Sequence, residues 1–162
     1  MPTTLRLILI TVLLLTVQTT IVSFMSVFNI VPDIMVIWIV YIAITQGQIR
    51  ATAFGFGIGL TIDLVSGQFL GLSALCKTLA GFIAGYFFQE NKIEITLGNY
   101  RFMVIVAVIS FVHNMIYFVI FTQGSDVGSF EAIFRFGLVS SLYTTTVSSI
   151  PMFMAMRKPQ LR

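Results

Sequence analysis

Charged side chains are scarce in this sequence. Asp, Glu, Lys and Arg make up 9% of the 162 residues, whereas an ordinary soluble domain carries about 25%. Because 57% of the residues are hydrophobic, a soluble fold could not cover its surface with polar groups. The composition therefore argues against a soluble protein and predicts an integral membrane protein, with a length that fits one domain over residues 1–162.

Cysteine, basic clusters and catalytic motifs are scarce as well. The single cysteine, Cys76, excludes an intrachain disulfide and a cysteine-based metal cluster. The net charge of +3 comes from scattered Lys and Arg residues, which is not the pattern of a nucleic-acid-binding protein. The motifs GxxxxGK[ST], GxGxxG, GxSxG and HExxH do not occur. We therefore expect no enzyme activity, no cofactor and no resident metal.

Long apolar runs fill most of the chain and are separated by short polar breaks. The first run is too long for the apolar part of a signal peptide and long enough to cross a bilayer, which takes about 20 residues. Pro32 and Asp33 suit the first turn of a new helix, and Pro151 should kink the last one. The sequence predicts an all-α membrane protein with six transmembrane helices, at about residues 5–28, 31–46, 51–66, 71–88, 102–121 and 131–156.

The basic residues predict the orientation of these six helices. Cytoplasmic loops of membrane proteins carry an excess of Lys and Arg. Of the nine Lys and Arg residues, Lys77 falls within a predicted span, Arg135 falls on one side, and seven fall on the other: Arg6, Arg50, Lys92, Arg101, Arg157, Lys158 and Arg162. Both termini are therefore predicted to be cytoplasmic, where the polar stretch 89–101 and the tail could contact anionic lipid or a filament.

The most informative stretch is residues 51–88, a predicted helical hairpin with one formal charge in each arm. A four-residue spacing, which places residues on one helix face, relates Gly55, Gly59 and Asp63 in the first arm and Lys77, Gly81 and Gly85 in the second. Asp63 and Lys77 differ in predicted depth by about 6 Å, so we predict an intramembrane Asp63–Lys77 pair. It could be a structural ion pair, or a site for a coupling ion, substrate or partner.

Small residues and two polar residues are further candidates. We assign helix packing or partner docking to six glycines, because small residues let membrane helices approach closely: Gly55, Gly59, Gly67, Gly71, Gly81 and Gly85. His113 and Asn114 lie in the middle of a predicted span. With no second ligand at a suitable spacing, they are predicted to form interhelical hydrogen bonds instead of a metal site.

The hairpin and the turn before the second helix resemble the MreD family of bacterial rod shape-determining membrane proteins. Val31-Pro32-Asp33 is followed, from Gly55 to Leu75, by G-x-x-x-G-x-x-x-D-h-x-S-G-x-x-x-G-h-x-A-L, where h is apolar. The length and the predicted six-helix layout also agree with that family. The resemblance implies a location in the bacterial cytoplasmic (inner) membrane and a fold similar to the substrate-binding subunit of energy-coupling-factor vitamin transporters.

The resemblance also implies a function. A family member would be a non-enzymatic scaffold of the cell-elongation machinery that regulates peptidoglycan synthesis, the elongasome. Its implied partners are the bitopic protein MreC, the synthase RodA with its transpeptidase, and the MreB filament. The alternative that the resemblance leaves open is a substrate-binding subunit of a vitamin transporter. Short, sparsely polar outer turns favour the scaffold over the receptor.

Overall fold

The computed structural model describes residues 3–22, 31–67, 69–123 and 133–156, and this part of the chain is helical with short connections. In chain order the elements are α1 (Thr3–Val17), η1 (Gln18–Val22), α2 (Ile34–Gln46), α3 (Gln48–Ser66), α4 (Leu72–Ala84), η2 (Gly85–Phe87), η3 (Glu90–Lys92), α5 (Ile93–Leu97), α6 (Tyr100–Phe121), η4 (Ile133–Gly137), α8 (Leu138–Val147) and α9 (Ser149–Met156).

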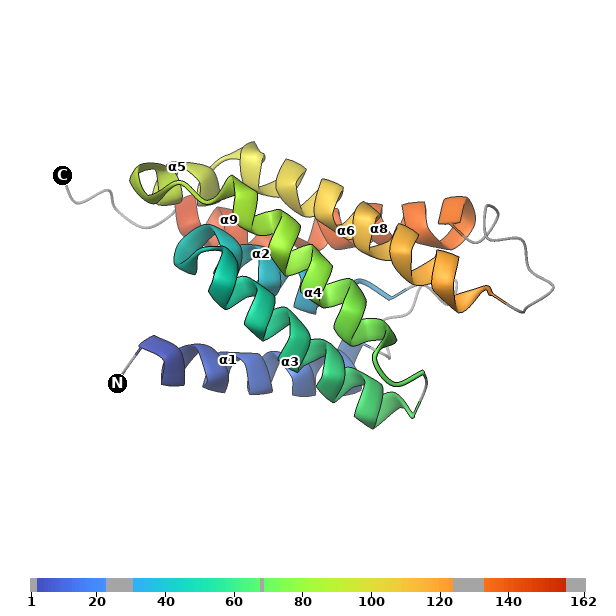
Figure 1. Cartoon of the computed structure of the whole chain (residues 1–162). Helices are drawn as coiled ribbons and strands as arrows, with labels where there is room; N and C mark the ends of the chain where they lie inside the picture. Colours follow the sequence, from blue (N-terminus) through green and yellow to red (C-terminus); the bar gives the residue numbers. More distant parts are fainter. Residues whose placement is uncertain (1–2, 23–30, 68, 124–132, 157–162) are drawn as a thin grey trace.

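Helix α2 is the centre of the bundle. Its residues are apolar almost all round, the composition of a helix with no solvent-facing side, and Met35, Val36, Ile39 and Ile42 are fully buried. Figure 1 shows α3 and α4 as an antiparallel hairpin in front of it, with α1 on one side and α6, α8 and α9 on the other. Trp38 joins α2 to α1 through a 2.8 Å hydrogen bond from its Nε1 to the hydroxyl of Thr11.

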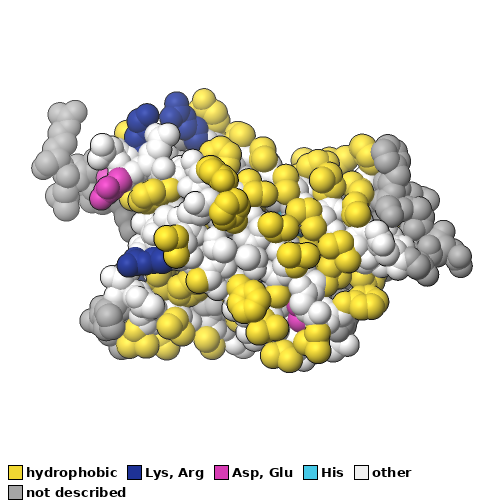
Figure 2. All heavy atoms as spheres, in the orientation of Figure 1, with side chains coloured by type: hydrophobic (Ala, Val, Ile, Leu, Met, Phe, Trp, Pro, Cys, Tyr) yellow, Lys and Arg dark blue, Asp and Glu magenta, His cyan; other side chains and the backbone are white. Residues whose placement is uncertain are grey.

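The outer surface of the bundle is largely apolar, as expected for a protein surrounded by lipid. Figure 2 shows hydrophobic side chains over most of one face and the Lys and Arg side chains gathered at one end. Among the described residues, α3, α6 and the segment Thr3–Thr20 are long and apolar enough to cross a membrane; α2 and Leu72–Phe87 are shorter apolar helices. These features describe a helical membrane protein.

Several helix boundaries differ from the sequence-based prediction: α2 begins at Ile34 instead of 31, and α6 begins at Tyr100 instead of 102. Helix α3 begins at Gln48, three residues before the predicted start at 51, because a single glycine suffices for the break: Gly47 has a φ of 87°. The stretch 89–101, predicted as a polar loop, contains η3 and the short helix α5. Figure 1 places α5 at the end of the bundle where α1 begins and α9 ends.

The segment predicted as one helix over 131–156 is interrupted. Helix α8 ends at Val147, and α9 begins at Ser149. Pro151 has no N–H to donate to the carbonyl of Val147 four residues earlier, so the regular hydrogen-bond ladder cannot continue there. Residues 131–132, and residues 23–28 of the first predicted helix, lie outside the described residues.

Candidate functional site

The candidate site is a buried ionic cluster built around Asp33 at the start of α2. Asp33 is the N-cap residue of α2, and its Oδ1 accepts a 3.1 Å hydrogen bond from the Val36 N–H. This bond satisfies one of the free N–H groups of the first helical turn. The second carboxylate oxygen, Oδ2, accepts a hydrogen bond and salt bridge from Nζ of Lys77 in α4.

Lys77 is enclosed by the bundle, because its side chain is only 4% exposed, against 20% for Asp33. A charge in such surroundings is stable only when it is paired, and Asp33 supplies the opposite charge. Nε2 of His113 in α6 lies 3.5 Å from the same ammonium group. The cluster therefore joins α2, α4 and α6 through their side chains.

The short link that carries Asp33 is held from two further elements. Gln18 in η1 donates from Nε2 to the Pro32 carbonyl at 3.1 Å and accepts from the Ile34 N–H at 2.9 Å. The Asp33 N–H donates to the Thr144 hydroxyl of α8 at 3.0 Å. These hydrogen bonds fix the backbone before α2 and so position the Asp33 carboxylate beside Lys77.

The predicted Asp63–Lys77 pair is wrong. In the described part of the chain Lys77 forms its salt bridge with Asp33, whereas Asp63 caps the other arm of its own hairpin. Its carboxylate accepts backbone hydrogen bonds of 2.9, 3.0 and 3.1 Å from Gly71, Ser73 and Ala74 at the start of α4. A carboxylate is stabilised by the exposed N–H groups and the positive dipole end of a helix N-terminus, so Asp63, only 1% exposed, needs no lysine.

Four of the six candidate glycines lie where α3 and α4 touch. A Cβ atom added to Gly55 would collide with the Lys77 carbonyl, and one added to Gly81 would lie 2.5 Å from the Ala51 carbonyl. The corresponding neighbours are the Ser73–Ala74 backbone for Gly59 and the Gln48 side chain for Gly85. These glycines bring the two backbones of the hairpin together.

Gly67 and Gly71 do not pack against another helix. A Cβ atom added to either would meet nothing within 4 Å, and their φ angles are 64° and 96°. This left-handed backbone favours glycine, so both residues shape the turn between α3 and α4. Their assignment to helix packing is corrected accordingly.

Asn114 and His113 lie side by side on α6 with different neighbours. Asn114 donates to the Ser141 hydroxyl of α8 at 3.0 Å and to the Gly137 carbonyl at 3.4 Å, and so forms interhelical hydrogen bonds. His113 contacts Lys77 through Nε2, while its buried Nδ1 has no hydrogen-bond partner among the described residues. Within the same part of the chain, no group of three His, Cys, Asp or Glu residues is placed to hold a metal ion.

The sequence-based site lacked three members of the cluster: Asp33 as the partner of Lys77, and Gln18 and Thr144 as its backbone supports. Asp33 had two visible signs, its place after a proline at a helix start and its place in the motif Val31-Pro32-Asp33. Gln18 stood out only as an amide within an apolar run, and Thr144 lies in a run of three threonines without a distinguishing sign.

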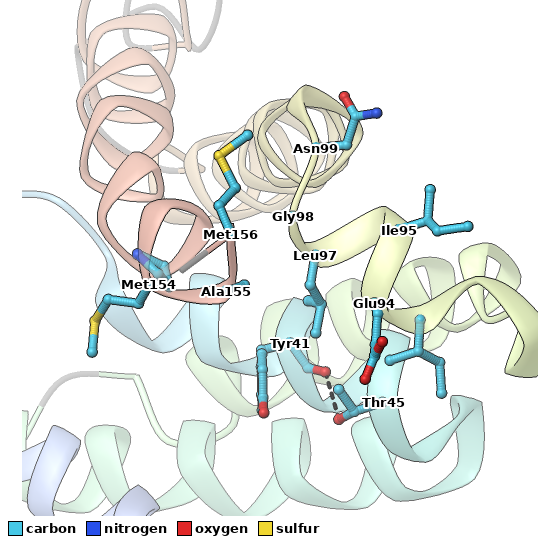
Figure 3. Close-up of a pocket in the computed structure, with 12 residues that line it drawn as sticks. Tyr41, Thr45, Glu94, Ile95, Leu97, Gly98, Asn99, Met154, Ala155 and Met156 are labelled. Atoms are coloured by element: carbon cyan, nitrogen blue, oxygen red, sulfur yellow. Dashed lines mark hydrogen bonds between the residues drawn. The ribbon is translucent and has the colours of Figure 1, made fainter. Parts of the chain in front are cut away.

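A second feature is an open cavity of about 710 Å³ at the α5 end of the bundle. Its walls come from the end of α2, from α5 with the residues after it, and from α9. Figure 3 shows the Glu94 side chain extending from α5 toward Thr45 of α2, with Met154 and Met156 on the α9 side. This cavity is separate from the ionic cluster.

The arrangement of the ionic cluster suits a brace better than a reaction centre. The Asp33 carboxylate is occupied by Lys77 and by the start of its own helix, and Asp63 is occupied by the start of α4.

In sequence comparisons, the family model of the rod shape-determining protein MreD matches residues 2–158. No curated protein and no solved structure matches this chain.

Proposed function

Because this chain belongs to the rod shape-determining protein MreD family, we propose that it is a non-enzymatic membrane scaffold of the bacterial cell-elongation machinery. Membership of the family supports a role in determining rod shape. The finer proposal is that the bundle binds an MreC-like bitopic protein and links it to a RodA-like peptidoglycan synthase with its transpeptidase, and to an MreB-like filament. The family match gives no support to the alternative of a vitamin-transporter subunit.

The proposal includes six membrane crossings in the inner membrane with both termini in the cytoplasm. Helix α2 has 13 residues, which at 1.5 Å per residue extend about 20 Å, less than the bilayer core of about 30 Å. This shortness is compatible with a crossing because α2 is the central helix, and neighbouring helices bury most of its residues. The described Arg6, Arg50, Lys92 and Arg101 would face the cytoplasm.

The observation that best supports a scaffold is the salt bridge between Lys77 and Asp33. It joins α4 to the start of α2, and hydrogen bonds from η1 and α8 hold the same link. A bundle fixed in this way presents constant outer helix faces, and these are what a partner helix can recognise by close packing.

The test is recovery of partners together with cell shape. The tagged full-length chain would replace the resident MreD protein of a rod-shaped bacterium, followed by gentle solubilisation and mass spectrometry. We expect rod-shaped cells and co-purification of the MreC-like protein, with the synthase in smaller amounts. Gly57→Ala, an exposed position where a Cβ atom meets nothing within 4 Å, is the control that should retain both. Rod shape without any MreC-like protein in the purified sample would contradict the scaffold proposal.

A further inference from the structure

Two buried polar atoms of α6 have no hydrogen-bond partner among the described residues: the Ser110 hydroxyl and Nδ1 of the His113 ring. Ser110 is fully buried, and His113 is 6% exposed. Buried polar atoms without a partner are rare in folded proteins, because such an atom loses its hydrogen bonds to water and gains none in return. Many helical hydroxyls of this chain donate to a carbonyl four residues earlier, as those of Thr78 and Ser141 do. The Ser110 hydroxyl makes no such bond.

The neighbour of His113 determines which ring nitrogen carries the proton. Nε2 lies 3.5 Å from Nζ of Lys77, and a lysine ammonium group donates hydrogen bonds but cannot accept them. Nε2 therefore faces the ammonium group as an acceptor, and a neutral imidazole that accepts at one nitrogen carries its proton on the other. The adjacent positive charge also favours the neutral ring. The Nδ1–H group is thus a buried donor that lacks an acceptor in the described part of the chain.

Ser110 and His113 are three positions apart in α6, so they lie on the same face of the helix with Cβ atoms about 5–6 Å apart. The Cα–Cβ bonds of a helix tilt toward its N-terminus, which brings the His113 side chain toward the turn that holds Ser110. A water oxygen that bonds two groups at about 2.7–3.2 Å each spans a gap of this size. We propose that one buried water molecule accepts a hydrogen bond from His113 Nδ1–H and donates one to the Ser110 hydroxyl.

The chemistry of this position selects water over an ion. The charge of Lys77 is already balanced by Asp33, so an added anion would be an unpaired buried charge. A cation would meet an N–H donor and an ammonium group, and within the described residues no group of three His, Cys, Asp or Glu side chains could hold a metal ion. A small neutral molecule that both accepts and donates fits the two atoms, and buried water typically joins such groups.

The proposed water extends the ionic cluster. The side chains then form a continuous path from Asp33 through Lys77 and His113 to Ser110, so the cluster holds α6 at two positions instead of one. This inference rests on the contacts of Lys77 and His113 and on the burial of Ser110. It is independent of the proposed scaffold function.

The experiment is solid-state NMR of the full-length chain, purified without a histidine tag, in phosphatidylethanolamine–phosphatidylglycerol vesicles. The sequence has one histidine and one tryptophan, so isotope labelling of these residue types gives ring-nitrogen signals that belong to His113 and Trp38. Transfer of magnetisation from water protons to each nitrogen is measured. Trp38 Nε1 is the matched control, because it already donates to the Thr11 hydroxyl at 2.8 Å. We expect the His113 proton on Nδ1 and faster transfer to Nδ1 than to Trp38.

Ser110→Val tests whether Ser110 holds the water. The valine methyl groups cannot hydrogen-bond and would occupy the space beside the ring, so the transfer to His113 Nδ1 should fall to the level of Trp38. Ser149→Val is the matched control, because the Ser149 hydroxyl bonds the Thr146 carbonyl three residues earlier and lies outside the cluster. It should leave the transfer unchanged.

The wild-type chain decides the inference even if Ser110→Val does not fold. A proton on Nε2 of His113, or transfer to Nδ1 no faster than to Trp38, would refute the water site. Undiminished transfer in a folded Ser110→Val chain would also overturn it, because the water would then be held by other groups. These measurements do not involve a partner protein, so their failure would leave the scaffold proposal standing, and failure to recover partners would leave the water site standing.

Discussion

Lys77 in α4 forms its salt bridge with Asp33, which lies 44 positions earlier in the chain and caps the start of α2. The nearer carboxylate along the hairpin, Asp63, is committed to the backbone of the turn. The two acids therefore have different tasks: Asp33 positions a helix against the hairpin, and Asp63 closes the hairpin itself.

Lys77→Met should destabilise the protein strongly, because it leaves the Asp33 carboxylate without its counter-charge. Removing one member of a buried pair typically costs about 3–5 kcal/mol. Asp33→Asn in the same chain should recover much of this loss, since Asn can still cap α2. The measurement is the free energy of unfolding in detergent micelles. As the control, Asp63→Asn combined with Lys77→Met should give the sum of the two single effects.

In Asp63→Ala, the start of α4 near Gly71 should open more readily than in the wild-type chain, whereas the end of α4 near Ala84 should be unaffected. Three backbone N–H groups lose their acceptor, and a lost helix cap costs up to about 2 kcal/mol. Hydrogen exchange should accelerate at the amides of Gly71, Ser73 and Ala74, with little change toward Ala84. Ser66→Ala, which removes an exposed hydroxyl with only a 3.4 Å bond to the Asp63 carbonyl, should alter stability by less than about 0.5 kcal/mol. Unchanged exchange in Asp63→Ala would contradict the capping role.

Gly55→Ala and Gly57→Ala should have opposite effects although they lie two positions apart in α3. The methyl group at 55 meets the Lys77 backbone, while the one at 57 meets open space. Overpacking costs about 1–3 kcal/mol, whereas alanine in an unobstructed helix gains up to about 1 kcal/mol over glycine. Melting temperatures in detergent measure both, and equal shifts would show that the two helix backbones are not in close contact.

Asn114→Ala and Ser141→Ala should weaken the contact between α6 and α8, and their effects should not be additive. Both variants remove the same 3.0 Å hydrogen bond, and coupling energies of such bonds in membrane proteins average about 0.6 kcal/mol. A double-mutant cycle on the free energy of unfolding measures the coupling. Asn114→Ala with Thr146→Ala, whose hydroxyl bonds only within its own helix, is the additive control.

The sequence predicted the apolar class, the hairpin and the positions of its small residues, because these depend on composition and on spacing along one helix. The four-residue repeat that contains Gly55 and Gly59 places both on one face, and the structure brings that face against α4. Gly67 and Gly71 could not be assigned in this way, since their role depends on backbone angles that residue spacing does not encode.

The partner of Lys77 could not be predicted from spacing. Depth along a helix follows from residue number, but which helices are neighbours depends on the packing of the whole bundle. Asp33 lies beside Lys77 because α2 is the central helix and contacts α3, α4 and α6. Asp63 is closer to Lys77 in sequence and was predicted at a similar depth, yet its carboxylate is occupied by the backbone N–H groups at the start of α4.

Gly47 is the single residue between α2 and α3. Its N–H donates a hydrogen bond to the Ala43 carbonyl of α2, and its carbonyl accepts one from the Ala51 N–H of α3. Helix α2 is therefore held at both ends: by the hydrogen bonds of Gly47 at its end and by the salt bridge of Asp33 with Lys77 at its start. A displacement of the hairpin at the Gly47 corner is therefore expected to move α2 as one unit, together with the Pro32–Asp33 link at its other end.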